Sequence, residues 1–109
     1  MKGKLHSHLK GINSYMADIS LPETLSNEFI ALIPKQRAFV KKMMNEGVIS
    51  NYSLSSDRKK LWVIINAATR FDAHNIIGSF PISNYIRYTI NNLLFHETNV
   101  AFVPHMWLN

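Results

Sequence analysis

The stretch from Glu46 to Asn66, EGVISNYSLSSDRKKLWVIIN, decides the fold of this chain. Two runs of β-prone residues, Val48–Leu54 and Leu61–Asn66, flank the polar segment SSDRKK at positions 55–60. This pattern is typical of an antiparallel hairpin whose loop is longer than two residues. We therefore expect the other elements of the chain to pack around this hairpin.

The second strand of the hairpin is apolar on both faces. Side chains alternate along a strand, so Leu61, Val63 and Ile65 share one face. Trp62 and Ile64 lie on the other face. A strand of this kind is usually covered on both sides. The helices of a chain of 109 residues can cover one side. We expect a second copy of the sheet to cover the other side, in a homodimer or larger homo-oligomer.

The residues before the hairpin predict one strand and one helix. The segment Ile12–Leu21 alternates as a strand does. Ser26 is a suitable N-cap for a first helix, and Gly47 suits the left-handed conformation just past its end. Pro34 predicts either a kink near residues 30–34 or a main helix that starts at Pro34.

The residues after the hairpin predict a second helix and a last strand. The helix starts at Thr69 or Asp72 and ends near Ser79, and Tyr85–Leu94 forms the strand. The resulting order, β-α-β-β-α-β, predicts an α+β ferredoxin-like sandwich: a four-stranded antiparallel sheet with two helices on one face. We expect residues 12–96 to form this domain. Residues 1–11 should be a flexible leader, and the apolar segment 97–109 should dock on its own or a neighbouring subunit.

Composition gives no support for a nucleic-acid partner. Three charges of the net +5 come from Lys2, Lys4 and Lys10, and the rest of the chain has nine basic against seven acidic residues. A short basic segment is most often simply solvated. RNA recognition modules share this strand order but need exposed aromatic residues and glycine in the third strand. Here that strand, KLWVIIN, has a single tryptophan and no glycine.

Other kinds of site are excluded by what the sequence lacks. Without cysteine there is no disulfide, thiolate ligand or cysteine nucleophile. The five histidines have no ligand-spaced pair outside the leader, so we expect no metal site. No apolar run approaches the roughly 20 residues of a membrane span, and the basic N-terminus has no apolar signal segment. We expect a cytoplasmic protein with no membrane contact.

Five short pieces of the chain occur at the same spacing along the sequence as in a known family. They are Glu46-Gly47, Trp62-Val63-Ile64, Phe80-Pro81, Tyr85-Ile86 and His96. In this register the chain resembles the muconolactone isomerase family, one of the dimeric α+β barrels. The resemblance runs without gaps from about Gly47 to His96, roughly half of the chain.

This resemblance implies a cofactor-free enzyme that moves a proton within an unsaturated lactone carboxylate, in a pocket between sheet and helices. Such chemistry needs a base, a donor to the developing oxyanion and a cation for the carboxylate. The isomerases carry basic and aromatic side chains on the second strand and an acidic group in the first helix. The corresponding residues here are Ser50, Asn51, Ser53 and Gln36. A non-catalytic small-molecule-binding or structural oligomeric module on the same fold is the alternative.

Five residues are candidates for such a pocket. Gln36, Arg37 and Trp62 are candidate substrate-binding residues, and Tyr52 and His96 are candidate catalytic residues. Arg37 would bind a small carboxylate. Tyr52 would donate to an oxyanion, and His96 titrates in the range that suits acid–base chemistry.

Each candidate also has a structural interpretation. Arg37 can be a solvated cation that covers apolar surface, and Gln36 can bond to neighbouring backbone. Tyr52 and Trp62 can form a cross-strand aromatic pair. His96 can be a hydrogen-bonded residue at the end of the last strand.

Three further polar features are expected to have no role in the pocket. His74 should be solvated on the second helix, and His105 should pack within the C-terminal segment, with a neighbouring subunit's pocket as the alternative place for its side chain. Asp57 and Arg58 should serve the hairpin turn.

Overall fold

The computed structural model describes residues 11–97, and these form the predicted α+β ferredoxin-like sandwich. The elements in chain order are β1 (Asn13–Ser20), α2 (Asn27–Asn45), β2 (Ile49–Leu54), β3 (Lys60–Ala67), α3 (Arg70–Gly78), the 3-10 turn η1 (Ser83–Tyr85) and β4 (Arg87–Leu93). The predictions for residues 1–10 and 98–109 lie outside the described residues.

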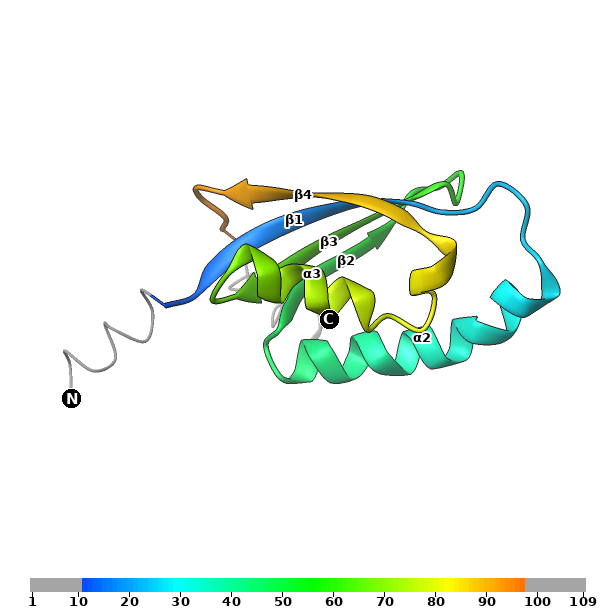
Figure 1. The fold of residues 1–109 in the computed structure, drawn as a ribbon, viewed down its shortest axis with the longest axis horizontal. Coiled ribbons are helices and arrows are strands. Elements are labelled where there is room, and N and C mark those ends of the chain that lie inside the picture. The colour runs from blue at the N-terminus through cyan, green and yellow to red at the C-terminus, as the bar shows by residue number, and fades with distance from the viewer. Residues whose placement is uncertain (1–10, 98–109) are drawn as a thin grey trace, which may run out of the picture.

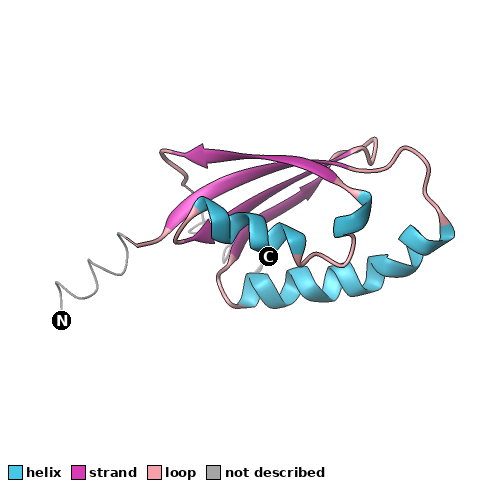
Figure 2. Cartoon of the chain, in the orientation of Figure 1, coloured by secondary structure: helices cyan, strands magenta, loops and turns pink. Residues whose placement is uncertain are grey.

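The four strands form one sheet with the order β2-β3-β1-β4, and every neighbouring pair is antiparallel. Figure 1 shows α2 and α3 on the same side of this sheet. Figure 2 shows the resulting two layers, strands on one side and helices on the other. The core lies between the layers, where Ala17, Val63 and Ile65 are fully buried. The hairpin and the fold class are therefore confirmed.

The opposite face of the sheet has an apolar centre with polar surroundings. Trp62 is 38% exposed there, and Ile64 next to it is 6% exposed. Lys60 Nζ lies 3.0 Å from a carboxylate oxygen of Asp18 and 3.3 Å from Ser20 Oγ. A second sheet on this face remains an expectation.

Helix α2 begins where its N-cap predicts. The Ser26 side chain accepts a hydrogen bond from the Phe29 backbone N–H at 3.1 Å, and Gly47 has φ +78° just past the helix end. The helix continues through Pro34, so the alternative of a main helix starting there is wrong. A proline cannot donate to the carbonyl four residues earlier, that of Ile30. Ile30 is 47% exposed, so water can replace that bond.

The hairpin loop is held by its own polar side chains. The Asp57 carboxylate accepts from Ser55 Oγ at 2.6 Å and from the Lys59 backbone N–H at 3.0 Å. These two hydrogen bonds lower the pKa of Asp57 below its ordinary value, and the bond from Ser55 has the larger effect. Arg58, the next residue, has φ 64°, the left-handed conformation that costs most residues about 1 kcal/mol or more. The predicted role of Asp57 in the turn is confirmed.

Within residues 11–97 no helix is long and apolar enough to cross a bilayer. The same part of the chain has no group of three or more histidine, aspartate or glutamate side chains placed to hold a metal ion.

Candidate ligand-binding site

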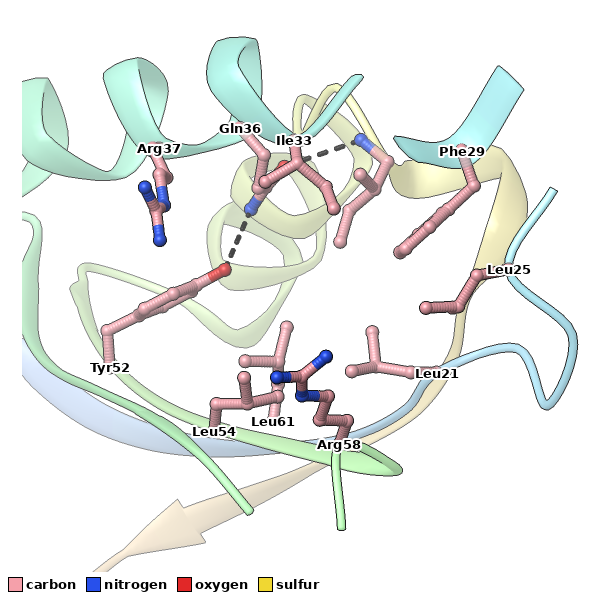
Figure 3. Close-up of a pocket in the computed structure, with 11 residues that line it drawn as sticks. Leu21, Leu25, Phe29, Ile33, Gln36, Arg37, Tyr52, Leu54, Arg58 and Leu61 are labelled. Atoms are coloured by element: carbon pink, nitrogen blue, oxygen red, sulfur yellow. Dashed lines mark hydrogen bonds between the residues drawn. The ribbon is translucent and has the colours of Figure 1, made fainter. Parts of the chain in front are cut away.

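A pocket of about 380 Å³ lies between the first half of α2 and the β2–β3 hairpin. Most of its wall is aliphatic or aromatic, and Figure 3 shows the side chains converging from both layers. The apolar wall consists mainly of Leu21, Leu25, Phe29, Ile33, Leu54 and Leu61. The polar part of the lining is formed by Gln36, Arg37, Tyr52 and Arg58. The pocket therefore has an apolar wall with four polar side chains in it.

The spacing of residues on α2 determines which of them line the pocket. Phe29, Ile33 and Gln36 follow one another at intervals of four and three residues, so they share one face of the helix. That face is turned toward the sheet, where Phe29 and Gln36 are buried. Gln36 is thus the polar residue at the end of an otherwise apolar row.

Among residues 11–97, Gln36 is the one buried residue with an amide or charged side chain, and it is 4% exposed. Its Nε2 donates to Tyr52 Oη at 3.3 Å, and its Oε1 accepts from the Ile82 backbone N–H at 3.3 Å. A buried amide needs partners for both of its ends. Here the partners come from β2 and from the segment before η1, so Gln36 joins three parts of the fold.

Tyr52 is half-buried at the pocket wall, with its hydroxyl toward α2 (Figure 3). Burial raises the pKa of Tyr52 above its ordinary value of 10.0, and the hydrogen bond from Gln36 opposes that shift. The phenol is therefore neutral at physiological pH and retains its proton.

Arg37 and Arg58 bring positive charge to the pocket from opposite sides. Arg37 projects from α2 beside the Tyr52 ring, and Arg58 extends from the hairpin loop (Figure 3). Both side chains are exposed, and neither forms an ion pair within residues 11–97. Their charges are consequently available to an anion at the pocket.

Three of the predicted site residues come together. Gln36, Arg37 and Tyr52 all line the pocket, which lies between the first helix and the sheet as expected. Their proposed roles toward a ligand stay predictions.

Trp62 does not join them. Across the hairpin Tyr52 pairs with Val63, and Trp62 pairs with Ser53. Because neighbouring residues of a strand point to opposite faces, Trp62 lies on the face that carries no helices. The expected Tyr52–Trp62 pair and the placement of Trp62 in this pocket are wrong.

His96 also lies elsewhere in the fold. His96 comes three residues after Leu93, which pairs with Ser14 at the start of β1. The pocket lies near the opposite end of β1, because its lining residue Leu21 directly follows that strand. In addition, β4 and β2 are the two opposite edges of the sheet, so the last strand is far from Tyr52. The placement of His96 in this pocket is wrong.

His74 is exposed, as expected, and its Nδ1 lies 2.9 Å from Tyr88 Oη. His105 lies outside the described residues.

Arg58 is the charged pocket residue that the sequence does not predict. The sequence predicts a role for it in the turn, and the structure places it both in the turn and in the pocket lining. The sequence signal was its position just after Asp57, the residue that organises the loop. A left-handed conformation at that position changes the direction of the side chain, which composition and periodicity do not reveal.

The comparisons with known proteins identify no family. No protein-family model matches the sequence, and no curated protein matches it. Among solved structures, a proposed antibiotic biosynthesis monooxygenase from Nitrosomonas europaea is similar, with 12% identity and a TM-score of 0.48, over 81% of this chain and 95% of that one. A likeness at that level says nothing about chemistry.

Proposed function

We propose that this pocket binds a small organic acid with an apolar body. The observation that carries the proposal is an apolar interior next to two arginines, Arg37 and Arg58, that have no carboxylate partner within residues 11–97. A guanidinium can bind a carboxylate through two parallel hydrogen bonds. The volume of about 380 Å³ falls within the range of roughly 300–1,000 Å³ that is usual for small-molecule sites.

A cofactor-free isomerase of the muconolactone isomerase type is the narrower form of this proposal. Arg37 would hold the carboxylate, and Tyr52 would donate to the developing oxyanion. The reaction also needs a base within hydrogen-bond reach of the substrate. Because the described lining contains no carboxylate and no imidazole, a second subunit would have to supply that base.

A non-catalytic binding module is the second candidate, and the composition of the lining favours it. Arginine, glutamine and a neutral tyrosine can hold an acid in place, but none of them takes a proton from carbon at neutral pH. The site as described is thus sufficient for binding without a reaction.

Calorimetric titration with a panel of small unsaturated acids tests the binding proposal. Arg37→Ala should weaken binding by about 1.5–3 kcal/mol, the worth of a hydrogen bond to a charged group. Lys35→Ala is the matched control, because Lys35 is exposed on the same helix but is absent from the lining. If the wild-type protein binds no acid of the panel, the proposal is contradicted.

Incubation of a bound acid in D₂O separates the two candidates. Deuterium incorporation at carbon, followed by NMR, supports an isomerase. Binding without incorporation supports the non-catalytic module.

A further inference from the structure

We propose that Gln36 is a positioning residue that makes Tyr52 a dedicated hydrogen-bond donor to the bound ligand. The inference rests on the proposed function, since it concerns the same pocket. It adds a requirement on the ligand, which must present an acceptor oxygen, and not a donor, to the Tyr52 hydroxyl.

The first step is the orientation of the Gln36 amide. The Ile82 backbone N–H lies 3.3 Å from one end of that amide. A backbone N–H can only donate, so this end of the amide must be the acceptor Oε1. Turning the amide over would place two N–H groups against each other in a buried position and leave both without an acceptor.

The second step is the direction of the Tyr52 hydrogen bond. With Oε1 fixed on Ile82, Nε2 faces Tyr52 Oη at 3.3 Å (Figure 3). An amide NH₂ can only donate, so Tyr52 Oη accepts. The phenol has one proton, and that proton points away from Gln36.

The third step is the use of that proton. Among residues 11–97, the hydrogen bond that Tyr52 Oη accepts from Gln36 is the only one that this hydroxyl forms. Its proton therefore has no acceptor in this part of the chain. Burial keeps the pKa of Tyr52 raised, so the proton is retained. A hydroxyl of the pocket lining with an unused proton selects for an acceptor oxygen on the ligand.

The arginines indicate which oxygen that is. Arg37 and Arg58 are exposed and attract the carboxylate, whereas Tyr52 is bonded to the buried Gln36. We therefore assign to Tyr52 a second, uncharged oxygen of the ligand, as in an oxo acid.

A matched pair of acids tests this assignment: 4-oxo-4-phenylbutanoate has a ketone carbonyl at the carbon where 4-phenylbutanoate has a methylene, and the two are otherwise identical. Wild-type protein should bind the oxo acid about fivefold to tenfold more tightly, the worth of one hydrogen bond. Tyr52→Phe should reduce this preference to about one.

Gln36→Glu should have the same effect while keeping the tyrosine. A carboxylate at this position can accept from both Ile82 N–H and the Tyr52 hydroxyl, so the tyrosine proton turns away from the ligand. The added negative charge weakens both acids alike, and for this reason the ratio of the two dissociation constants is the readout. Ala38→Glu is the control, because it adds the same charge at an exposed position of α2 and should preserve the preference.

A ligand-free NMR measurement completes the design. The Gln36 Nε2 protons should show nuclear Overhauser contacts with the Tyr52 ring. The Ile82 amide proton should keep its protection from exchange in Gln36→Glu and lose it in Gln36→Leu.

The outcomes separate the two proposals. If both acids bind equally to wild type, or if Gln36→Glu keeps the preference for the oxo acid, the positioning role is overturned while the proposed function stands. If neither acid binds, the proposed function fails for this class of acid. In that case the nuclear Overhauser contacts of the Gln36 Nε2 protons test the orientation of the amide. Contacts to the Tyr52 ring support the positioning role, and contacts to Ile82 in their place overturn it.

Discussion

Ile49 and Tyr52 point to the same face of β2, although three positions separate them and a regular strand would place them on opposite faces. The cause is a bulge at Ser50. Ile49 pairs with Ile65, but Asn51 pairs with Ile64, so two steps along β2 match one step along β3. The bulge therefore brings the tyrosine hydroxyl to the side where Gln36 and the pocket lie.

Deleting Ser50 should be tolerated, because it removes the extra residue and leaves Tyr52 opposite Val63. The expected loss is about 1 kcal/mol, for the hydrogen bond at 2.6 Å that Ser50 Oγ accepts from Asn66. Urea unfolding measures it. Deleting Ser53 is the control, since it shifts Leu54 out of register and should cost several times more. Equal losses from the two deletions would contradict this account of the bulge.

Replacing Gln36 by leucine should lower the free energy of unfolding by about 1–3 kcal/mol, even though leucine is apolar and of similar size. The reason is that the Ile82 N–H loses its acceptor in a buried position. Lys35→Leu on the exposed side of α2 should change stability by less than about 0.5 kcal/mol. A Gln36→Leu protein as stable as wild type would show that this hydrogen bond is not needed.

The parts of the fold that could be predicted from the sequence depend on local chemistry. Ser26 is an N-cap because its side chain can accept from the helix, and Gly47 ends the helix because it tolerates positive φ. Gln36 could be placed at the pocket because it interrupts an apolar row. Each of these features involves residues close in the chain.

The parts that could not be predicted depend on register and topology. Without the bulge, the pairing that starts at Ile49 would have placed Tyr52 opposite Trp62, on the face of the sheet that carries no helices, so a single extra residue decides whether Tyr52 reaches the pocket. His96 follows a strand whose antiparallel course carries it away from the pocket. Neither effect leaves a periodic signal in the sequence.

Stability should fall at alkaline pH because of Tyr52. Its pKa is raised in the folded protein, so the folded state holds this proton more tightly than the unfolded state does. The associated stability is present below the ordinary value of 10.0 and is lost as the pH rises from there through the folded pKa. Thermal unfolding between about pH 9 and 11 should therefore show a steeper loss for wild type than for Tyr52→Phe. Identical pH dependence would contradict the burial of this phenol.

The face of the sheet that carries no helices should mediate a homodimer through Trp62, which is 38% exposed there. Each Å² of apolar surface removed from water contributes roughly 25 cal/mol, so pairing this face stabilises the assembly. Sedimentation should give a dimer for wild type and a shift toward monomer for Trp62→Lys. A stable wild-type monomer at micromolar concentration would rule out this interface.

The most direct test of the central claim is an NMR titration of the ¹⁵N-labelled protein with 4-oxo-4-phenylbutanoate. The side-chain Nε–H signals of Arg37 and Arg58 and the side-chain amide of Gln36 should shift with one common dissociation constant. The indole N–H of Trp62, on the other face of the sheet, serves as the internal reference and should stay in place. Shifts confined to Trp62, or no shift at either arginine, would contradict a ligand site between α2 and the hairpin.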